Sequence, residues 1–303
     1  MFHKQLVGKT LEQLVAARND VSTRADYEYR NQIMHWLSTG DPSSNHLAAR
    51  KKHQPSTGNW LFAGTDFAIS TEYVRFLPMW SQTYFRSQLT IANLAGCGKT
   101  ILSSTIIEHL RPYCDPEPSL AVAYFYFDFI SKQTVAECVS SLIKQLFVQE
   151  EVPPDSLKEL YNKCGDGSHK ASIFDLTNLL ETFATSRKGN LSDIFFVIDA
   201  LDECPKDGQQ DFLKLIEEMK SWESSKIHLL TSRPEQDIRD VVSPLTTKAI
   251  SIQGCHVDSD ISLYVVSQLA ADPKLKKLSP QMKAEIEGTL AKKANGMQVN
   301  LIV

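Results

Sequence analysis

The fold of this chain is indicated by one stretch, Leu94-Ala95-Gly96-Cys97-Gly98-Lys99-Thr100. Its two glycines let backbone N–H groups approach a polyphosphate that a Cβ atom would obstruct. The lysine is placed to reach the β- and γ-phosphates, and the threonine hydroxyl is placed to bind Mg²⁺. A helix that begins here directs its N-terminal dipole at the same anion. The predicted nucleotide-binding residues are Ala95, Gly96, Cys97, Gly98, Lys99, Thr100 and Ile101.

The residues on either side of this stretch are typical of a strand and a helix. Residues 88–92 form a short strand-like run, and residues 101–110 repeat apolar side chains at helical spacing. One position differs from the full phosphate-loop pattern, because Asn93 stands where a glycine is expected, five residues before Gly98. Asparagine tolerates a positive φ better than most residues. We therefore expect the turn to survive, with weaker affinity for phosphate.

A second motif joins an apolar run over residues 194–198 to the carboxylates of Asp199, Asp202 and Glu203. A continuous apolar run is typical of a strand that is buried on both faces of a parallel sheet, and ligands bind at the carboxyl ends of such strands. We predict that Asp199 holds Mg²⁺ together with Thr100. Asp202 or Glu203 is predicted to orient the attacking water or to accept its proton.

A third strand is predicted over residues 226–232, and it leads into Arg233. An arginine at the carboxyl end of a strand is placed to sense the γ-phosphate and to stabilise its developing charge. The simpler interpretation is a surface ion pair with Glu235, which contributes little energy. Because the two other motifs are present, we predict a catalytic role for Arg233.

The three motifs together resemble a known family. They read Ala-Gly-Cys-Gly-Lys-Thr at 95–100, Phe-Phe-Val-Ile-Asp-Ala-Leu-Asp-Glu-Cys at 195–204 and His-Leu-Leu-Thr-Ser-Arg-Pro-Glu at 228–235. In this order they resemble the NACHT class of signal-transduction P-loop NTPases, most closely fungal-type proteins with a nephrocystin-like N-terminal NTPase domain. Residues 45–50 and 57–61 also match that family. The resemblance implies Walker A and Walker B motifs and a nucleotide switch with C-terminal helices that close over the nucleotide.

The order of the expected elements predicts the fold class. Between residues 56 and 253 strands alternate with helices, which is typical of a P-loop NTPase α/β fold, a three-layer parallel sheet with helices on both faces. Helical segments are predicted to flank it, over residues 1–55 and 254–303, and the second is expected to be truncated relative to the family. A strand is predicted at 121–127, and the aromatic run at 124–129 is expected to lie in the core rather than to stack on bases.

The bulk composition narrows the class of protein. The chain has 303 residues, a net charge of −4 and 42% hydrophobic residues, which is typical of one sizeable α/β domain with helical flanks. The slightly acidic balance argues against a nucleic-acid partner, and no apolar run is long enough for a membrane span. The six cysteines show no metal-binding spacing. We therefore expect a cytoplasmic protein with reduced thiols, no nucleic-acid partner and no membrane span.

Two functions from different classes remain open. The first is a signal-transduction switch that binds ATP or GTP with Mg²⁺, hydrolyses it slowly, and controls conformation and assembly through self-association or protein partners. The intact polar residues of the three motifs favour this function. The second is a nucleotide-binding scaffold or remnant without useful hydrolysis, which Asn93 favours. A small-molecule kinase is disfavoured, because the sequence has no evident arginine-rich lid.

Overall fold

A five-stranded parallel sheet lies at the centre of the protein. The computed structural model describes residues 24–38, 40–63, 87–92, 98–117, 119–150, 153–185, 193–222, 227–233, 235–245, 248–250 and 255–294. The strands are β1 (Ser87–Ala92), β2 (Leu120–Tyr126), β3 (Asp193–Asp199), β4 (Ile227–Ser232) and β5 (Lys248–Ile250). They are arranged in the order β2-β3-β4-β1-β5, and every neighbouring pair is parallel. The predicted parallel α/β fold is confirmed.

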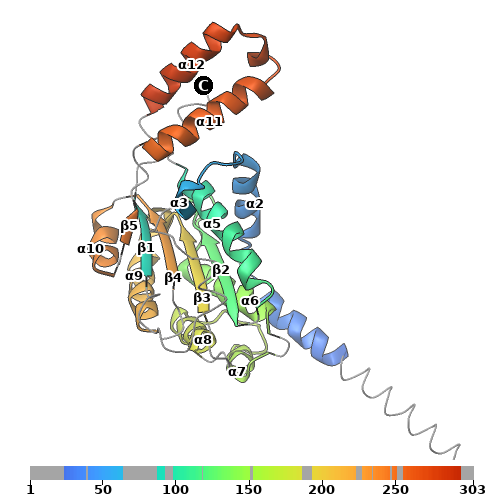
Figure 1. The fold of residues 1–303 in the computed structure, drawn as a ribbon. Coiled ribbons are helices and arrows are strands. Elements are labelled where there is room, and N and C mark those ends of the chain that lie inside the picture. The colour runs from blue at the N-terminus through green and yellow to red at the C-terminus, as the bar shows by residue number, and fades with distance from the viewer. Residues whose placement is uncertain are drawn as a thin grey trace, which may run out of the picture.

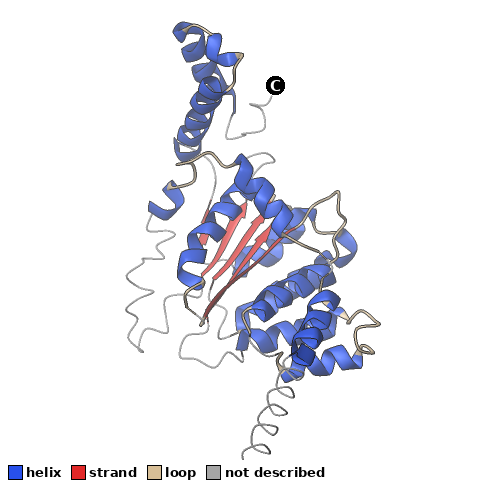
Figure 2. Ribbon diagram, turned by 90° about the vertical axis from the view of Figure 1, so that its right-hand side faces the viewer, coloured by secondary structure: helices blue, strands red, loops and turns tan. Residues whose placement is uncertain are grey.

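Helices cover both faces of the sheet, which gives three layers (Figures 1 and 2). One face packs against α5 (Lys99–Cys114), with α2 (Ser43–Lys52) and α3 (Trp60–Ala63) beside it. The helices of the other face are α6 (Val135–Val148), α7 (Asp155–Lys163), α8 (Ile173–Thr185), α9 (Lys206–Ser221) and α10 (Gln236–Leu245). A helix over residues 24–36 also packs on this second face, through Ile33.

The side chains of β3 alternate between two hydrophobic cores. Ile194, Phe196 and Ile198 belong to the core under α6 and α8. Phe195 and Val197 belong to the core under α5. Successive side chains of a strand point to opposite faces, so a strand between two helical layers needs apolar residues at every position. This confirms the prediction that the second motif begins in a strand buried on both faces.

The aromatic strand β2 is part of both cores. Tyr124 and Tyr126 lie under α5, and Phe125 and Phe127 lie on the opposite face. All four side chains are buried. The expectation of a core run is therefore confirmed for residues 124–127. It is wrong for Phe129, which is 59% exposed because it follows the end of the strand. At its carboxyl end, β2 pairs Tyr126 with Asp199 of β3 in the sheet register.

A helical hairpin projects from the sheet domain at the C-terminal end of the described chain (Figure 1). It consists of α11 (Cys255–Ala271), the short helix η3 (Leu275–Lys277) and α12 (Pro280–Ala294). Helical structure was predicted over residues 254–303, and the described part of that range, from residue 255 to 294, forms these helices. The part of the predicted helical segment that precedes residue 24 lies outside the described residues.

The predicted domain limits at residues 55 and 253 remain predictions. Within the part of the chain that the structure describes, no helix is both long enough and apolar enough to cross a membrane.

Candidate functional site

The three predicted motifs end at one edge of the sheet. β1 and β4 end side by side, because Ala92 is paired with Ser232. β3 ends nearby at Asp199. α5 begins at the same edge, directly after Gly98, whose φ of 85° is the left-handed conformation that glycine adopts without strain. The strand order therefore gathers the motif ends, which are far apart in the sequence, beside the N-terminus of one helix.

Four of the seven predicted nucleotide-binding residues belong to the start of this helix. Gly98 is its N-cap, and Lys99, Thr100 and Ile101 form its first turn. The remaining three, at positions 95–97, lie outside the described residues, as does Asn93. Exposed N–H groups at a helix N-terminus attract anions, so the described half of the motif has the local structure that phosphate binding needs.

Asp199 joins three elements of the site at one carboxylate. It is 1% exposed. Its Oδ1 atom accepts hydrogen bonds from the Ser103 hydroxyl of α5 at 2.7 Å and from the Thr231 hydroxyl of β4 at 2.6 Å. Burial raises the pKa of the Asp199 carboxyl group. That rise is opposed by hydrogen bonds from Thr231, Thr100 and Ser103 and by the charge of Lys99.

The donor atoms at this point fit a magnesium ion. Mg²⁺ prefers hard oxygen ligands, and usually takes one or two of them from a protein together with substrate phosphates. The Thr100 hydroxyl is hydrogen-bonded to the Asp199 carboxylate, so the two predicted ligands lie side by side. The structure therefore brings together the pair that the sequence predicts.

Asp202 and Arg233 are bound to each other. Ala200 adopts a left-handed conformation with φ of 59°, which turns the chain at the end of β3 into the short helix η2 (Leu201–Glu203). The Asp202 carboxylate is 3% exposed. It accepts a hydrogen bond from the Arg233 backbone N–H at 2.8 Å and pairs with the Arg233 Nε at 3.0 Å. This carboxylate therefore fixes the end of β4 and the direction of the arginine.

Glu203 lies beside this pair and is only partly buried. One of its carboxylate oxygens, Oε2, accepts a hydrogen bond from the Phe129 N–H at 3.3 Å. Burial raises the pKa of the Glu203 carboxyl group, and the neighbouring charge of Asp202 raises it further. The Phe129 N–H and the positive charge of Arg233 oppose this rise. A carboxylate with a raised pKa is better suited to accept a proton near neutral pH.

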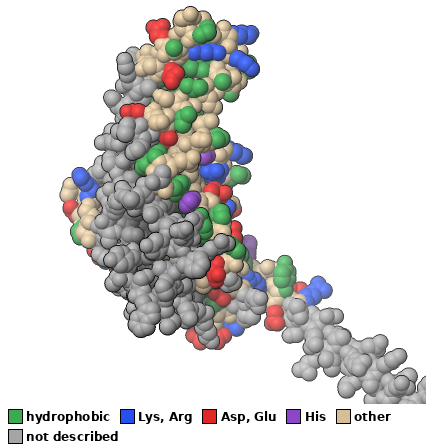
Figure 3. All heavy atoms as spheres, viewed as in Figure 1, with side chains coloured by type: hydrophobic (Ala, Val, Ile, Leu, Met, Phe, Trp, Pro, Cys, Tyr) green, Lys and Arg blue, Asp and Glu red, His purple; other side chains and the backbone are tan. Residues whose placement is uncertain are grey.

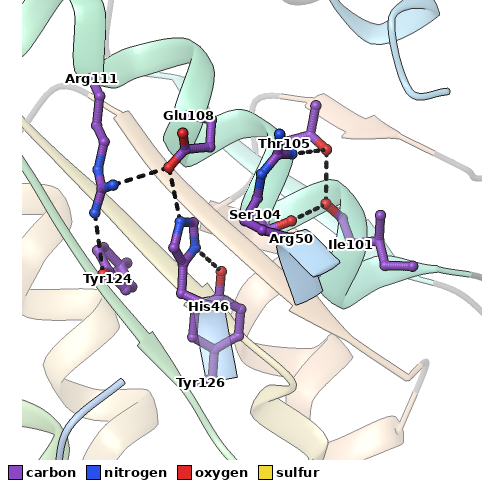
Figure 4. Close-up of polar contacts among 9 residues, drawn as sticks. All are labelled: His46, Arg50, Ile101, Ser104, Thr105, Glu108, Arg111, Tyr124 and Tyr126. Atoms are coloured by element: carbon purple, nitrogen blue, oxygen red, sulfur yellow. Dashed lines mark hydrogen bonds and ion pairs between the residues drawn. The ribbon is translucent and has the colours of Figure 1, made fainter. Parts of the chain in front are cut away.

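A polar network connects α5 to α2 and to strand β2 (Figure 4). The buried His46 of α2 contacts the Tyr126 hydroxyl through Nδ1 at 2.9 Å and the Glu108 carboxylate through Nε2 at 2.9 Å. Burial lowers the pKa of His46, more than its contact with Glu108 raises it. In the neutral ring, Nε2–H donates to Glu108 and Nδ1 accepts from Tyr126. Glu108 also pairs with Arg111 at 3.0 Å, one turn along α5.

Several of these positions have no clear signal in the amino-acid sequence. Ser103 and His46 were not predicted as site residues, because a hydroxyl on a helix or a histidine in a polar segment has no functional spacing of its own. One signal was present for Ser103: it lies one helical turn after Lys99 and therefore on the same side of α5. For the network in Figure 4 no such signal was available.

Comparison with known proteins identifies a matching family and two structures of similar fold. The family described as "Nephrocystin 3, N-terminal" matches residues 56–233. No curated protein matches the chain. The structure of the Aeropyrum pernix ORC1 protein in complex with DNA is 15% identical, with a TM-score of 0.45, over 68% of this chain and 50% of that one. The structure of Drosophila ORC bound to DNA is 13% identical, with a TM-score of 0.47, over 86% of this chain and 59% of that one.

The expectation that nucleic acid is excluded as a partner is wrong, because both of these similar structures are complexes with DNA. The bound DNA belongs to the structures of those two proteins. The physical reason for the error is that a net charge averages over the whole surface. Lysines 274, 276 and 277 are exposed together around η3, and Figure 3 shows Lys and Arg side chains gathered at the free end of the hairpin. A negative total therefore coexists with local positive surface.

Proposed function

The chain belongs to the nephrocystin 3 N-terminal family, and from this premise we propose that it binds ATP or GTP with Mg²⁺ and acts as a nucleotide switch of the NACHT type. The observation that carries the proposal is the junction at Asp199. There the carboxylate at the end of β3 lies against the first turns of the helix that begins with Lys99 and Thr100. A buried carboxylate beside a helix N-terminus and a lysine suits a metal–polyphosphate complex.

Each residue of the junction has a proposed role. The first turn of α5, with loop residues 95–97, cradles the phosphates through backbone N–H groups, and Lys99 adds a positive charge at the β- and γ-phosphates. Thr100 and Asp199 hold Mg²⁺, which neutralises charge on the phosphate oxygens when it is bound. Ser103 and Thr231 hold the Asp199 carboxylate in place through their hydroxyl groups.

Glu203 is the better candidate for the residue that orients water and takes its proton. The Asp202 carboxylate accepts hydrogen bonds from two N–H groups of Arg233, one on each oxygen, and so holds the end of β4. Glu203 has a raised pKa and a single backbone hydrogen bond from Phe129. We assign water activation to Glu203 and positioning of Arg233 to Asp202.

Arg233 is proposed to stabilise charge on the γ-phosphate. Its ion pair with Asp202 uses the Nε atom, and 44% of its side chain is exposed. The guanidinium group also lies over the Phe129 ring, with 6.0 Å between Cζ and the ring centroid. These contacts hold the guanidinium group at the carboxyl edge of the sheet, where a nucleotide on α5 would be bound.

The remaining expectations complete this proposal. In this proposal, hydrolysis of the nucleotide is slow and resets the switch. The nucleotide state controls the assembly of the protein with other copies of itself or with protein partners. The protein acts in the cytoplasm. The helical segment over 1–55 and the region from 254 onward flank the NTPase domain over 56–253.

Nucleotide binding is tested by calorimetry with Mg-ATP and Mg-GTP. Lys99→Ala removes one charged contact to phosphate, worth about 1.5–3 kcal/mol, so we expect binding to weaken at least about tenfold. Lys163→Ala is the matched control, because Lys163 pairs with Asp175 on the opposite face of the sheet. We expect this variant to bind nucleotide as the parent does. Equal binding by the Lys99→Ala variant and the parent would refute the proposed site.

Hydrolysis is tested separately by phosphate release. Glu203→Gln keeps the size of the side chain but removes the proton acceptor, so we expect binding to persist and phosphate release to fall about 10²-fold or more. Glu217→Gln on the exposed side of α9 is the control. A parent chain that binds nucleotide but releases no phosphate would favour the scaffold without hydrolysis.

A further inference from the structure

A buried carboxylate joins the C-terminal hairpin to the sheet domain. Asp260 of α11 is 9% exposed. Its Oδ2 atom accepts hydrogen bonds from the Gly58 backbone N–H at 2.8 Å and from the Trp60 indole N–H at 3.0 Å. The two donors precede Asp260 by 202 and 200 residues, so this contact is a product of the tertiary fold. Hydrogen bonds to an ionised acceptor are roughly twice as strong as neutral ones.

The turn that supplies these donors also packs against the proposed nucleotide helix. Gly58 has a φ of 78°, and a Cβ atom there would lie 3.3 Å from Leu102 Cδ1 and 3.9 Å from Thr105 Cγ2 of α5. Leu102 closes the first hydrogen-bonded turn of that helix, because its N–H donates to the Gly98 carbonyl at 2.9 Å. The turn therefore lies between Asp260 and the part of α5 that begins with Lys99.

Apolar side chains pack close to the contact between Asp260 and the turn. Leu61, which follows the turn, belongs to the same core as Leu102 of α5 and as Ile261 and Val265 of α11. In Figure 1 the base of α11 lies near α3, whereas its outer end and η3 project away from the sheet domain. The hairpin is therefore attached to the sheet domain at its base, near Asp260. A movement of the chain at Asp260 would shift the position of the whole hairpin.

We propose that Asp260 is a positioning residue that couples the α11–α12 hairpin to nucleotide binding by holding the turn at residues 57–60 against α5. This inference rests on the proposed nucleotide switch and names the contact through which that switch moves the hairpin. The coupling is reciprocal: if nucleotide changes the contact, the contact changes nucleotide affinity by the same factor. Release of the turn loosens the start of α5, and binding must then order it.

The contact can be observed through Trp60. The chain has four tryptophans, so replacement by 5-fluorotryptophan gives four ¹⁹F signals, and Trp60→Phe identifies the signal of residue 60. We expect this signal to shift when Mg-ATP or Mg-GTP binds. Asp260→Ala is expected to shift the same signal without nucleotide, to abolish its response to nucleotide, and to weaken nucleotide binding at least about fivefold.

Asp258→Ala is the matched control, because Asp258 is an exposed carboxylate in the first turn of the same helix. It should leave the residue 60 signal and nucleotide affinity unchanged. Asp260→Asn removes the charge but keeps the shape, so it replaces Asp260→Ala if circular dichroism shows that the alanine variant is unfolded; we then expect smaller effects in the same direction.

The outcomes separate this inference from the proposed function. If calorimetry shows that nucleotide binds but the residue 60 signal does not respond, the coupling is wrong and the switch proposal stands. Equal behaviour of the Asp260 and Asp258 variants also overturns the coupling. If no nucleotide binds, the proposed function fails and the coupling fails with it, and the signal shift in Asp260→Ala then reports only a structural contact.

Discussion

Thr231 is the position at which the structure makes the sharpest prediction. Its side chain is buried, its hydroxyl donates to Asp199 Oδ1 at 2.6 Å, and the same hydroxyl oxygen accepts from the Ala200 N–H at 2.9 Å. Thr231→Val keeps the shape of the side chain and removes both hydrogen bonds. It leaves a buried N–H group and a buried carboxylate each without one partner.

The expected loss of stability follows from these two bonds. A hydrogen bond to the ionised carboxylate contributes about 2 kcal/mol, and an unsatisfied buried N–H group costs about 2 kcal/mol. The additional apolar surface of valine returns about 1 kcal/mol. The free energy of unfolding should therefore fall by about 3 kcal/mol. Thr231→Ser keeps the hydroxyl and loses only a buried methyl group, so it should cost about 1 kcal/mol.

Urea unfolding at neutral pH measures these differences. Thr185→Val is the control, because Thr185 is exposed at the end of α8 and its hydroxyl donates to the Glu181 carbonyl at 2.9 Å. This change should stay within about 0.5 kcal/mol. The reasoning is refuted if Thr231→Val costs less than about 1 kcal/mol, or if the serine variant loses as much as the valine variant.

Two further predictions concern pH and backbone conformation. In the folded state, burial lowers the pKa of His46 below its ordinary value of 6.5. As the pH falls, the unfolded chain therefore binds a proton at this histidine before the folded chain does. The contribution of neutral His46 to the free energy of unfolding is present above about pH 6.5 and is lost as the pH decreases below it. His46→Gln should flatten the change in urea midpoint between about pH 7.5 and 5.5, and parallel profiles would contradict this. Gly167→Ala should cost about 1–3 kcal/mol, because Gly167 has a φ of 82° and a Cβ atom would lie 2.7 Å from the Tyr161 ring. At Gly288 of helix α12, an added Cβ atom would meet no atom within 4 Å, so Gly288→Ala should raise the thermal midpoint slightly. A lower thermal midpoint for both variants would argue against the conformational explanation.

Much of the fold could be predicted because its signals are local. The apolar run that ends at Asp199 predicts a strand buried on both faces, and β3 contributes side chains to both cores. The spacing of apolar residues after Lys99 predicts the helix α5, which the structure extends to Cys114. These patterns depend on the period of the strand or helix alone. The order of the strands has no such signal, because it depends on which strands pair across long stretches of chain.

The proposed site shows the same division. The amino-acid sequence was sufficient to place Lys99, Thr100 and Asp199 at one sheet edge, since the carboxyl ends of parallel strands lie together. It could not distinguish Asp202 from Glu203, because both follow the same strand. The structure distinguishes them through Arg233, which binds Asp202 and leaves Glu203 with one backbone partner.

Motif chemistry and the alternation of strands and helices are therefore properties of the chain itself, and they are sufficient to indicate a P-loop α/β fold. Only the tertiary structure decided which polar groups are paired. His46 meets Glu108 and Tyr126, and Asp260 meets the turn at Gly58, across long separations in sequence. The physical reason is that burial and hydrogen-bond partners are set by non-local packing, whereas periodicity and residue chemistry are set by neighbours along the chain.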